Sequence, residues 1–359
     1  MSARRRDFLK LPMAAAAAAA PLTAAPIGEH NPANAKLVRR LPAELSDDDM
    51  LFLKQIGLRW ARVNFRSAGA DYDVVARAQQ RYESYGMRIH SAVYSAYREI
   101  DLQLGRPGRD KHIESYRTFL RHCGKLGIPV ASYDFHPANT YTTSKVTAER
   151  GYETREFRVD DFRNKVEKQR YDRVYPVEEI WAAYEYFMKA TLPAAREAGV
   201  RMALHPDDPP LAMMNGVGKM FVRYEGYKRA EEIAEAIEGP GSPHWGLTFC
   251  VGTWSEGGDR MGKDVFSMIE DFGGRAKIFE VHFRAVTSPL PNFQETLPDE
   301  GYLDLYRVMK ALRKVRFSGA VMPDHVPALA GDSGINRAGT AYCIAYMRAL
   351  LERANQEVG

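Results

Sequence analysis

The sequence predicts a single (β/α)8 barrel, and three observations point to that fold. Short apolar runs typical of buried strands alternate with longer helical patterns, and eight such pairs are present when a weak first strand is included. At 359 residues and 45% hydrophobic content, the chain is long enough for one large α/β domain with a sizeable core. Four later strand candidates end in a polar side chain, at the edge where parallel barrels build their active sites.

The first half of the chain supplies four of the strands. Ser46 is expected to cap the first helix and Gly57 to follow its end. Gly86, Gly127 and Gly199 follow the next three helical patterns, where glycine accepts the left-handed conformation that ends a helix. The expected strands are 36–41, 60–65, 87–93 and 128–135, and the helices after the first are 71–85, 110–125 and 177–198.

The second half repeats the same alternation. Its expected strands are 200–204, 246–249, 277–281 and 319–323, and its expected helices are 224–237, 263–272, 303–315 and 342–353. One segment, 136–176, is far longer than an ordinary connection between a strand and a helix. Since it follows the fourth strand on the functional face, we expect a lid or substrate loop, with disorder as the alternative.

The N-terminus is typical of a bacterial twin-arginine export signal. Arg5 and Arg6 lie in a charged region before seven consecutive alanines, and small residues at 23–25 suit cleavage. The alternative is a basic tail before an alanine-rich helix. The expected organisation is a signal peptide at 1–25, a proline-rich linker at 26–35 and a catalytic barrel at 36–359, in a protein exported to the periplasm.

Net charge, the lack of a second long apolar stretch and the cysteine count bear on the expected partners and on disulfide bonding. The formal net charge of +4 falls to about +1 when residues 1–25 are removed, because four basic residues and one acidic residue leave with them. We therefore expect no nucleic-acid partner and, since no other stretch is long and apolar enough, no membrane contact after signal removal. The three cysteines are too few for a disulfide framework, and Cys123 and Cys343 lie in helical patterns that predict core positions.

Four residues at successive strand ends form a candidate metal site. They are His205, Cys250, His282 and Asp324. Two imidazoles, a thiolate and a carboxylate are a reasonable donor set for a divalent cation. Each residue alone is more often a packed or hydrogen-bonded core residue, so at this point the metal site and the purely structural interpretation both stay open.

The residues around these four positions closely resemble the mannonate dehydratase family, whose members are xylose-isomerase-like barrels. The matching stretches are 201–210 (RMALHPDDPP), 246–253 (GLTFCVGT), 279–284 (FEVHFR), 301–312 (GYLDLYRVMKAL) and 323–325 (PDH). The resemblance implies removal of water from a sugar acid to give a 2-keto-3-deoxy acid. It also implies a divalent metal ion, with Mn²⁺ expected and Zn²⁺, Fe²⁺ and Co²⁺ as alternatives.

The same resemblance assigns roles to individual residues. It makes the four strand-end residues the metal ligands and His325 the acid/base histidine. Arg284 is expected to hold the substrate carboxylate, with a structural salt bridge as the alternative. Asp207 and Asp208 are expected to orient ligands or to accept substrate hydroxyls, with capping of the following segment as the alternative.

The chain departs from the family pattern after His325. The family carries a second catalytic tyrosine there, whereas here no tyrosine occurs until Tyr342, inside the last helical pattern. We expect His136 or Tyr141 from the long loop to contact the substrate and to replace that group. D-Mannonate itself is accordingly expected to be a poor substrate.

Two other functions fit the same residues. One is a sugar or sugar-acid isomerase or epimerase on the same metal platform, and the other is an exported binding protein without turnover. His325 argues against the binding protein, because binding alone needs no acid/base histidine. The expected partner is a small-molecule sugar acid, and the oligomeric state, including a homo-oligomer, stays open.

Overall fold

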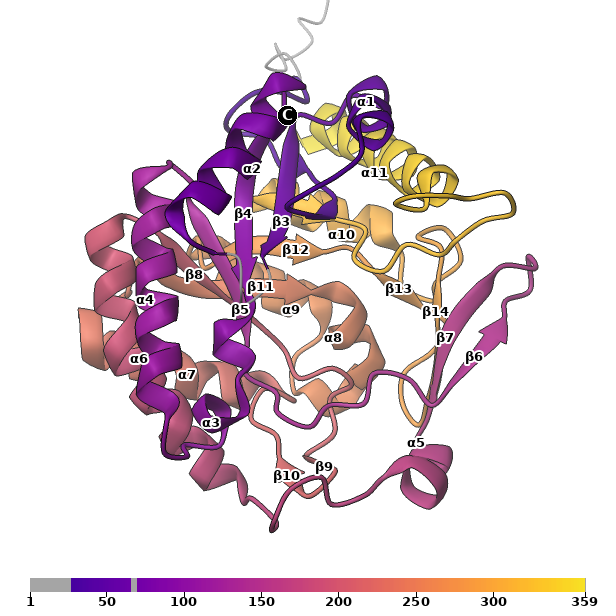
Figure 1. The fold of residues 1–359 in the computed structure, drawn as a ribbon. Helices are drawn as coiled ribbons and strands as arrows, with labels where there is room; N and C mark the ends of the chain where they lie inside the picture. The colour runs from indigo at the N-terminus through magenta and orange to yellow at the C-terminus, as the bar shows by residue number, and fades with distance from the viewer. Residues whose placement is uncertain (1–26, 66–69, 359) are drawn as a thin grey trace, which may run out of the picture.

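The computed structural model describes residues 27–65 and 70–358, and a closed barrel of parallel strands lies at its centre (Figure 1). The strands are hydrogen-bonded in the order β1-β15-β12-β11-β8-β5-β4-β3-β2. The two end strands, β1 (Lys36–Leu37) and β2 (Arg40–Pro42), come from one short segment that pairs with β15 on one side and with β3 on the other. This segment closes the sheet, so the predicted (β/α)8 barrel is confirmed.

The remaining barrel strands agree with the predicted apolar runs to within a few residues. They are β3 (Trp60–Phe65), β4 (Arg88–Tyr94), β5 (Val130–Asp134), β8 (Arg201–His205), β11 (Trp245–Cys250), β12 (Ile278–His282) and β15 (Ala320–Met322). Nearly all their side chains are buried, as expected for strands covered by helices outside and packed against each other inside.

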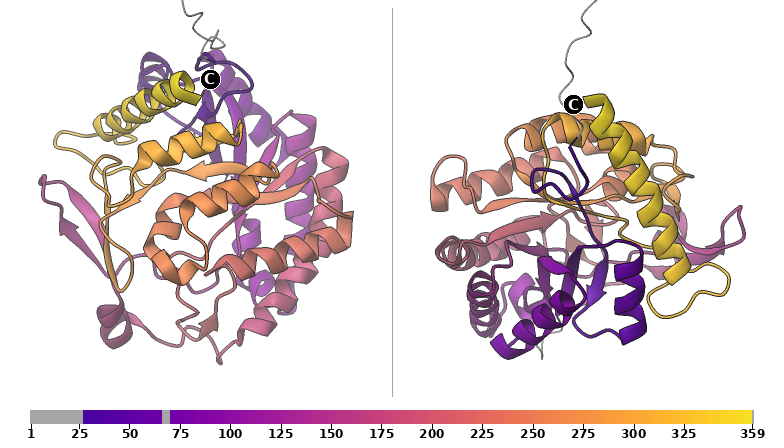
Figure 2. Two further views of the ribbon diagram at one scale, coloured as in Figure 1. Left: turned by 180° about the vertical axis from the view of Figure 1, so that it is seen from behind. Right: turned by 90° about the horizontal axis from the view of Figure 1, so that it is seen from above.

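Helices surround the barrel on the outside (Figure 2). The longer ones are α1 (Asp47–Gln55), α2 (Tyr72–Ser84), α4 (Arg109–Lys125), α6 (Val177–Ala198), α7 (Tyr224–Glu238), α10 (Leu305–Lys314) and α11 (Arg337–Val358). The Ser46 side chain accepts a hydrogen bond from the Asp49 N–H as predicted, and Gly199 ends α6 in the left-handed conformation. Cys123 and Cys343 lie buried in α4 and α11, so both predicted core positions are confirmed.

Three helical regions differ from the prediction. The helix expected at 263–272 is a short α9 (Val265–Met268) that continues as a π-helical turn, η4 (Ile269–Gly273). The last helix begins at Arg337, earlier than expected. A further helix, α8 (Val251–Gly257), follows Cys250 directly, which its glycines had concealed because glycine is a poor helix former.

The long segment 136–176 is largely ordered by a second, smaller sheet. Its hairpin, β6 (Ser144–Thr147) and β7 (Glu153–Arg158), joins β14 (Asn292–Thr296) and β13 (Ala285–Val286) in the order β13-β14-β7-β6. Because β13 and β14 follow the barrel strand β12, this sheet stands beside the carboxyl ends of the barrel strands (Figure 1). Movement of this segment as a lid stays a prediction.

The described part of the proposed linker contacts the barrel. Asn34 and Ala35 are buried, and Glu29 forms an ion pair with Arg348 of α11 at 3.0 Å. The middle of α11 therefore lies close to the start of the described chain. The predicted signal peptide falls outside the described residues, and within residues 27–65 and 70–358 no helix has the length and apolar character of a membrane span.

Candidate active site and metal centre

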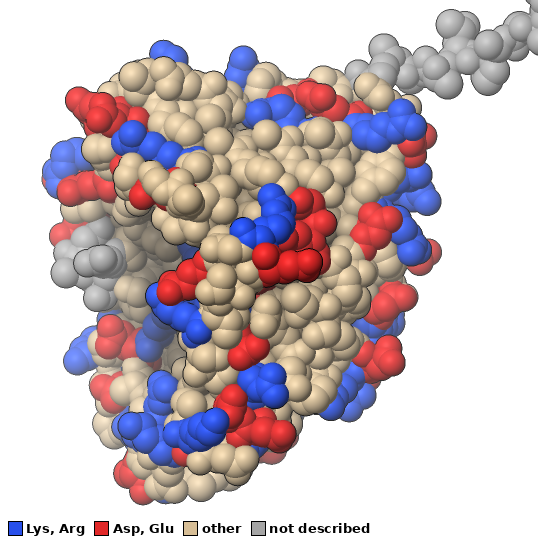
Figure 3. Space-filling model, turned by 90° about the vertical axis from the view of Figure 1, so that its right-hand side faces the viewer, with Lys and Arg blue, Asp and Glu red and all other residues tan. Residues whose placement is uncertain are grey.

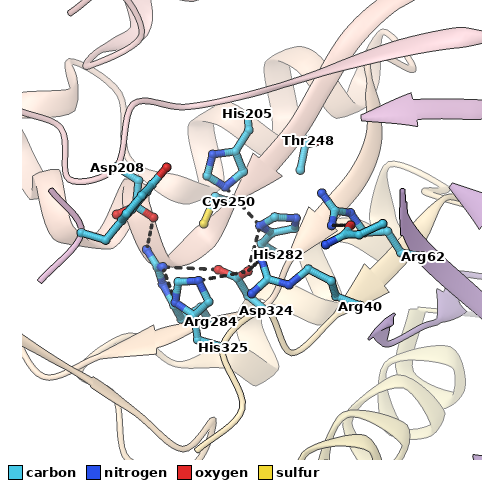
Figure 4. A network of polar contacts seen from close by, with 12 residues as sticks. Arg40, Arg62, His205, Asp208, Thr248, Cys250, His282, Arg284, Asp324 and His325 are labelled. Carbon is cyan, nitrogen blue, oxygen red and sulfur yellow. Dashed lines mark hydrogen bonds and ion pairs between the residues drawn. The ribbon is translucent and has the colours of Figure 1, made fainter. Parts of the chain in front are cut away.

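The four predicted metal ligands meet at the carboxyl ends of four neighbouring strands (Figure 4). His205, Cys250 and His282 are the last residues of β8, β11 and β12, and their ligand atoms all lie within 4.8 Å of one another. His205 Nε2 is 3.1 Å from His282 Nδ1, and Asp324 Oδ1 is 3.3 Å from the same nitrogen. The parallel register that places Cys250 beside His282 is what brings these side chains together.

Asp324 lies beyond the end of its strand. Alternation along a strand would point Asp324 and His325 to opposite sides, but β15 already ends at Met322. Asp324 instead adopts a left-handed backbone conformation with φ +45°, which aspartate tolerates better than most residues. The resulting bend turns the buried Asp324 carboxylate towards His282 and leaves the His325 ring partly exposed.

Contacts outside the ligand set orient both ligand histidines. His205 Nδ1 donates to the Pro206 carbonyl at 2.8 Å, which leaves Nε2 with a free lone pair. His282 Nε2 lies 3.3 Å from Glu280, so Nδ1 faces the other ligands. Glu280 is held in turn by Arg62 at 2.6 Å. Such outer contacts are typical of metal-binding histidines.

The electrostatics of the site favour a cation. Burial, together with the neighbouring His282, lowers the pKa of His205 well below its usual value, so its ring is neutral. Burial raises the pKa of Asp324, but His325 and His282 outweigh it and hold that pKa well below the usual range. Burial alone lowers the pKa of His282, yet Asp324 raises it to about 10, so positive charge is stabilised at the nitrogen that faces the other ligands.

The Cys250 sulfur is held in place by the start of a helix. Cys250 is the N-cap of α8, and its sulfur accepts the Thr253 N–H at 3.4 Å. A cysteine that binds a metal ion does so as a thiolate. Together with the neutral His205 and the ionised Asp324, this donor set fits a divalent ion.

A polar cavity of about 220 Å³ opens beside the ligands. His205, His282 and Asp324 lie in its wall, together with His325, His136 and Tyr141, the three residues predicted to act on the substrate. The loop residues and the barrel residues thus share one cavity. Its polar walls suit a small molecule with many hydroxyls.

His325 forms a pair with a carboxylate that sequence reasoning missed. Its Nδ1 lies 2.8 Å from Glu295 of β14 and 3.1 Å from an Arg284 nitrogen, and Arg155 lies 3.5 Å from both ring nitrogens. In the tautomer in which Nδ1 donates to Glu295, the lone pair is on Nε2, which lies 3.7 Å from Asp324. No signal in the sequence marks Glu295, because it approaches His325 only through the second sheet.

His136 and Tyr141 form a second hydrogen-bonded group in the cavity. His136 Nε2 is 2.7 Å from Asp134 at the end of β5 and 3.2 Å from the Tyr141 hydroxyl. Asn139 lies 2.8 Å from His136 Nδ1. Both ring nitrogens of His136 therefore have hydrogen-bond partners within the protein. Of this group, the Tyr141 hydroxyl is the one that can contact a substrate.

Arg284 does not have the predicted role of a free carboxylate-binding group. It is only 2% exposed, and its guanidinium forms ion pairs with Asp208 at 3.0 Å, with Glu256, and with Glu295 and Asp324 at 3.3 Å each. Four protein carboxylates thus occupy the donors that a substrate would need. Arg284 is therefore a structural salt-bridge residue, the alternative given above. It links Asp324 at the candidate metal site to Glu295 of the second sheet.

The two aspartates after His205 also differ from the expectation. Asp207 accepts the backbone N–H groups of Met220 and Phe221 at 3.1 and 2.8 Å, so it fixes the loop before α7 instead of facing the cavity. Asp208 does line the cavity, but its carboxylate is paired with Arg284. Both fit the capping or orienting roles better than contact with substrate hydroxyls.

Four arginines in the cavity wall were not predicted. Arg62 pairs with Glu280 and Arg98 pairs with Asp134, so each balances a buried carboxylate. Among the described residues, the ion-pair partner of Arg40 is Asp324 at 3.8 Å, and Arg155 contacts the His325 ring at 3.5 Å. These two guanidinium groups are the ones left to neutralise a bound anion.

Comparisons with known proteins agree with the geometry. Residues 69–175 and 150–358 match the model of the family described as D-mannonate dehydratase (UxuA). A mannonate dehydratase of Streptococcus pneumoniae (strain 70585) is 29% identical over 331 residues, covering 85% of each chain. Mannonate dehydratase 2 of Halalkalibacterium halodurans is 29% identical over 260 residues, covering 65% of this chain and 72% of its own.

Solved structures give the same result. The crystal structure of mannonate dehydratase from Streptococcus suis serotype 2 superposes with a TM-score of 0.77 at 27% identity, covering 91% of this chain and 96% of that one. A structure of L-ribulose 3-epimerase, at a TM-score of 0.55 and 12% identity over 90% of this chain and 96% of its own, shares the barrel fold alone. Because the family model spans most of the sequence, this chain belongs to the D-mannonate dehydratase family of carbon–oxygen hydro-lyases.

Proposed function

We propose that this chain removes water from a sugar acid to give a 2-keto-3-deoxy acid, using His325 and Tyr141 as its two proton-transfer groups. One observation carries the assignment: both groups line the same cavity as His205, His282 and Asp324. A dehydratase needs a base for the hydrogen on C2 and an acid for the leaving hydroxyl on C3, next to a group that acidifies C2. An epimerase would not need the second acid at C3.

The four strand-end residues would hold the divalent ion. When bound, the ion supplies Lewis-acid polarisation of the substrate carboxylate and 2-hydroxyl, which makes the C2 hydrogen more acidic. Mn²⁺ is the ion that we propose, because the family resemblance favours it. The mixture of nitrogen, sulfur and oxygen donors also suits Zn²⁺, Fe²⁺ and Co²⁺.

The proton steps follow from the contacts of each group. His325 Nε2 takes the proton from C2 while Glu295 holds the other ring nitrogen. The Tyr141 hydroxyl, positioned by His136, gives its proton to the C3 hydroxyl, which leaves as water. The enol that results becomes the 2-keto acid when C3 gains a proton. Arg40, beside Asp324, is placed to offset the substrate carboxylate.

A substrate screen tests the proposed function directly. The purified, metal-loaded protein is incubated with hexonates and pentonates, D-mannonate included, and the products are assayed as 2-keto-3-deoxy acids. We expect one or more acids to be dehydrated and D-mannonate to be a poor substrate, because the family's second tyrosine is replaced. Formation of an epimer or an isomer without loss of water would contradict the proposal.

Replacing Tyr141 by phenylalanine is expected to slow turnover by about two orders of magnitude, the lower end of the usual cost of losing a general acid. The ring and its contact with His136 remain, so folding and metal content should be preserved. Tyr186→Phe is the matched control, since its hydroxyl bonds Asp110 on the outer helices. Equal rates for Tyr141→Phe and the wild type would exclude Tyr141 as the acid.

We further propose export of the folded, metal-loaded protein to the periplasm. Support comes from Arg5 and Arg6 in front of the alanine-rich stretch. Replacing both arginines by lysines should leave the protein in the cytoplasm, as measured by cell fractionation and immunoblotting. Export of the double variant at the wild-type level would refute the twin-arginine route.

A further inference from the structure

A second cavity, of about 370 Å³, adjoins the catalytic one on the side of the β6–β7 hairpin. Arg40, Arg155, Asp324 and His325 line both cavities. Figure 3 shows the face of the molecule that carries the hairpin, where charged side chains gather and the surface is hollowed to one side. The two cavities are therefore adjacent, and the side chains of these four residues lie between them.

Two arginines of the second cavity, Arg39 and Arg155, form no ion pair with a described carboxylate. Within residues 27–65 and 70–358, Arg39 donates only to the Thr340 hydroxyl and the Arg40 carbonyl, at 3.3 and 3.2 Å. Arg155 contacts the His325 ring and forms no ion pair with any described carboxylate. Arg39 is only 9% exposed, and holding a nearly buried charge without a counter-ion is costly.

The acidic residues of the second cavity are already engaged. Glu153 pairs with Lys145 at 2.8 Å, and Glu295 and Asp324 both lie 3.3 Å from Arg284. Each acidic residue of the second cavity thus has an ion-pair partner other than Arg39 and Arg155. Burial lowers the pKa of Arg39 only to about 10, so the group is still a cation at neutral pH.

We propose that the second cavity receives a second anionic group of the substrate. This group lies at the end of the substrate opposite to the carboxylate that adjoins C2. Arg39 and Arg155 are its binding groups, and the substrate class is a sugar acid that is charged at both ends. This inference rests on the proposed dehydratase function. A carboxylate and a phosphate share the required chemistry, because guanidinium groups bind both with paired hydrogen bonds.

The test compares three acids of the same stereochemistry: an unmodified hexonate, the hexarate with a second carboxylate, and the hexonate 6-phosphate. We expect kcat/KM for the hexarate, the hexonate 6-phosphate or both to exceed that for the hexonate by about tenfold or more, the scale of one charge-assisted hydrogen-bonding group. Whichever of the two acids reacts better identifies the second anion as carboxylate or phosphate. Arg39→Gln and Arg155→Gln should each reduce the ratio of its kcat/KM to that of the hexonate by about tenfold.

Arg150→Gln is the matched control. Arg150 lies in the turn of the same hairpin, is 45% exposed in its side chain, pairs with Asp299 and lines neither cavity. Its replacement should leave unchanged the ratio of kcat/KM for the acid charged at both ends to kcat/KM for the hexonate. Equal kcat/KM for all three acids, or ratios that neither Arg39→Gln nor Arg155→Gln alters, would overturn the proposal while leaving the dehydratase function intact.

A binding measurement separates this proposal from the function on which it rests. Calorimetry on the Mn²⁺-loaded His325→Ala variant compares the affinity for the hexarate, the hexonate 6-phosphate and the hexonate without turnover. The second anion site is supported if the hexarate or the hexonate 6-phosphate binds more tightly than the hexonate and if this difference is lost in the double variant with Arg155→Gln. This holds even if no acid is dehydrated. Equal affinities for the three acids would exclude it.

Discussion

Replacing His325 by alanine is expected to lower turnover by roughly two to four orders of magnitude, the usual scale for a missing general base. The physical reason is that Nε2 carries the lone pair that accepts the proton when Nδ1 donates to Glu295. Metal content should be retained, because Asp324 and not His325 completes the ligand set. Turnover is followed as formation of the 2-keto-3-deoxy acid, and metal by elemental analysis of the same sample.

Two controls make the His325 result specific. Glu295→Gln keeps the size of the side chain but removes the charge that orients His325, so it should show a smaller loss of turnover than His325→Ala. Imidazole added to His325→Ala is expected to restore part of the activity, which a purely structural defect would not allow. Efficient dehydration of D-mannonate that His325→Ala leaves untouched would overturn both the catalytic role and the expected change in substrate.

The second large effect concerns the metal. Cys250→Ser and Asp324→Asn should each cause strong loss of the bound divalent ion and, with it, of activity, because each variant removes a negative ligand from a buried site. One ion per chain is expected in the wild type. Metal affinity should also fall as the pH drops, since a thiol and an imidazolium must each release a proton before they can bind the ion.

Cys343→Ser provides the matched control for the metal ligands, because Cys343 is also buried but lies in α11. It should retain the ion. Circular dichroism of each variant separates loss of metal from loss of the fold. Full occupancy by metal in both Cys250→Ser and Asp324→Asn would refute the ligand assignment.

Several features of this protein could be predicted because they depend on local sequence. An apolar run that ends in a polar residue defines a strand and its carboxyl end, so His205, Cys250 and His282 were placed at strand ends before their distances were known. The order of parallel strands in a barrel follows the order of the chain, and this brings successive strand ends to one side. The juxtaposition of His205, Cys250 and His282 followed from these two facts.

The rest was decided by contacts between segments distant in sequence. Glu295 meets His325 because β14 pairs with β7, and Arg39, Arg40 and Arg155 converge because the hairpin folds over the first strand. Arginine and glutamate are common on any surface, so nothing in the sequence distinguishes those that reach a cavity from those that stay in solvent.

Arg284 and Asp324 show the same division most clearly. The sequence alone determined that both residues follow a strand end at the candidate metal site. The role of Arg284, however, depends on the four carboxylates from separate elements that surround its guanidinium. The direction of the Asp324 carboxylate depends on a left-handed bend that period-two alternation does not predict. Local sequence patterns determine which secondary-structure element carries a residue and at which end. Tertiary packing determines which groups its side chain contacts, and therefore its role.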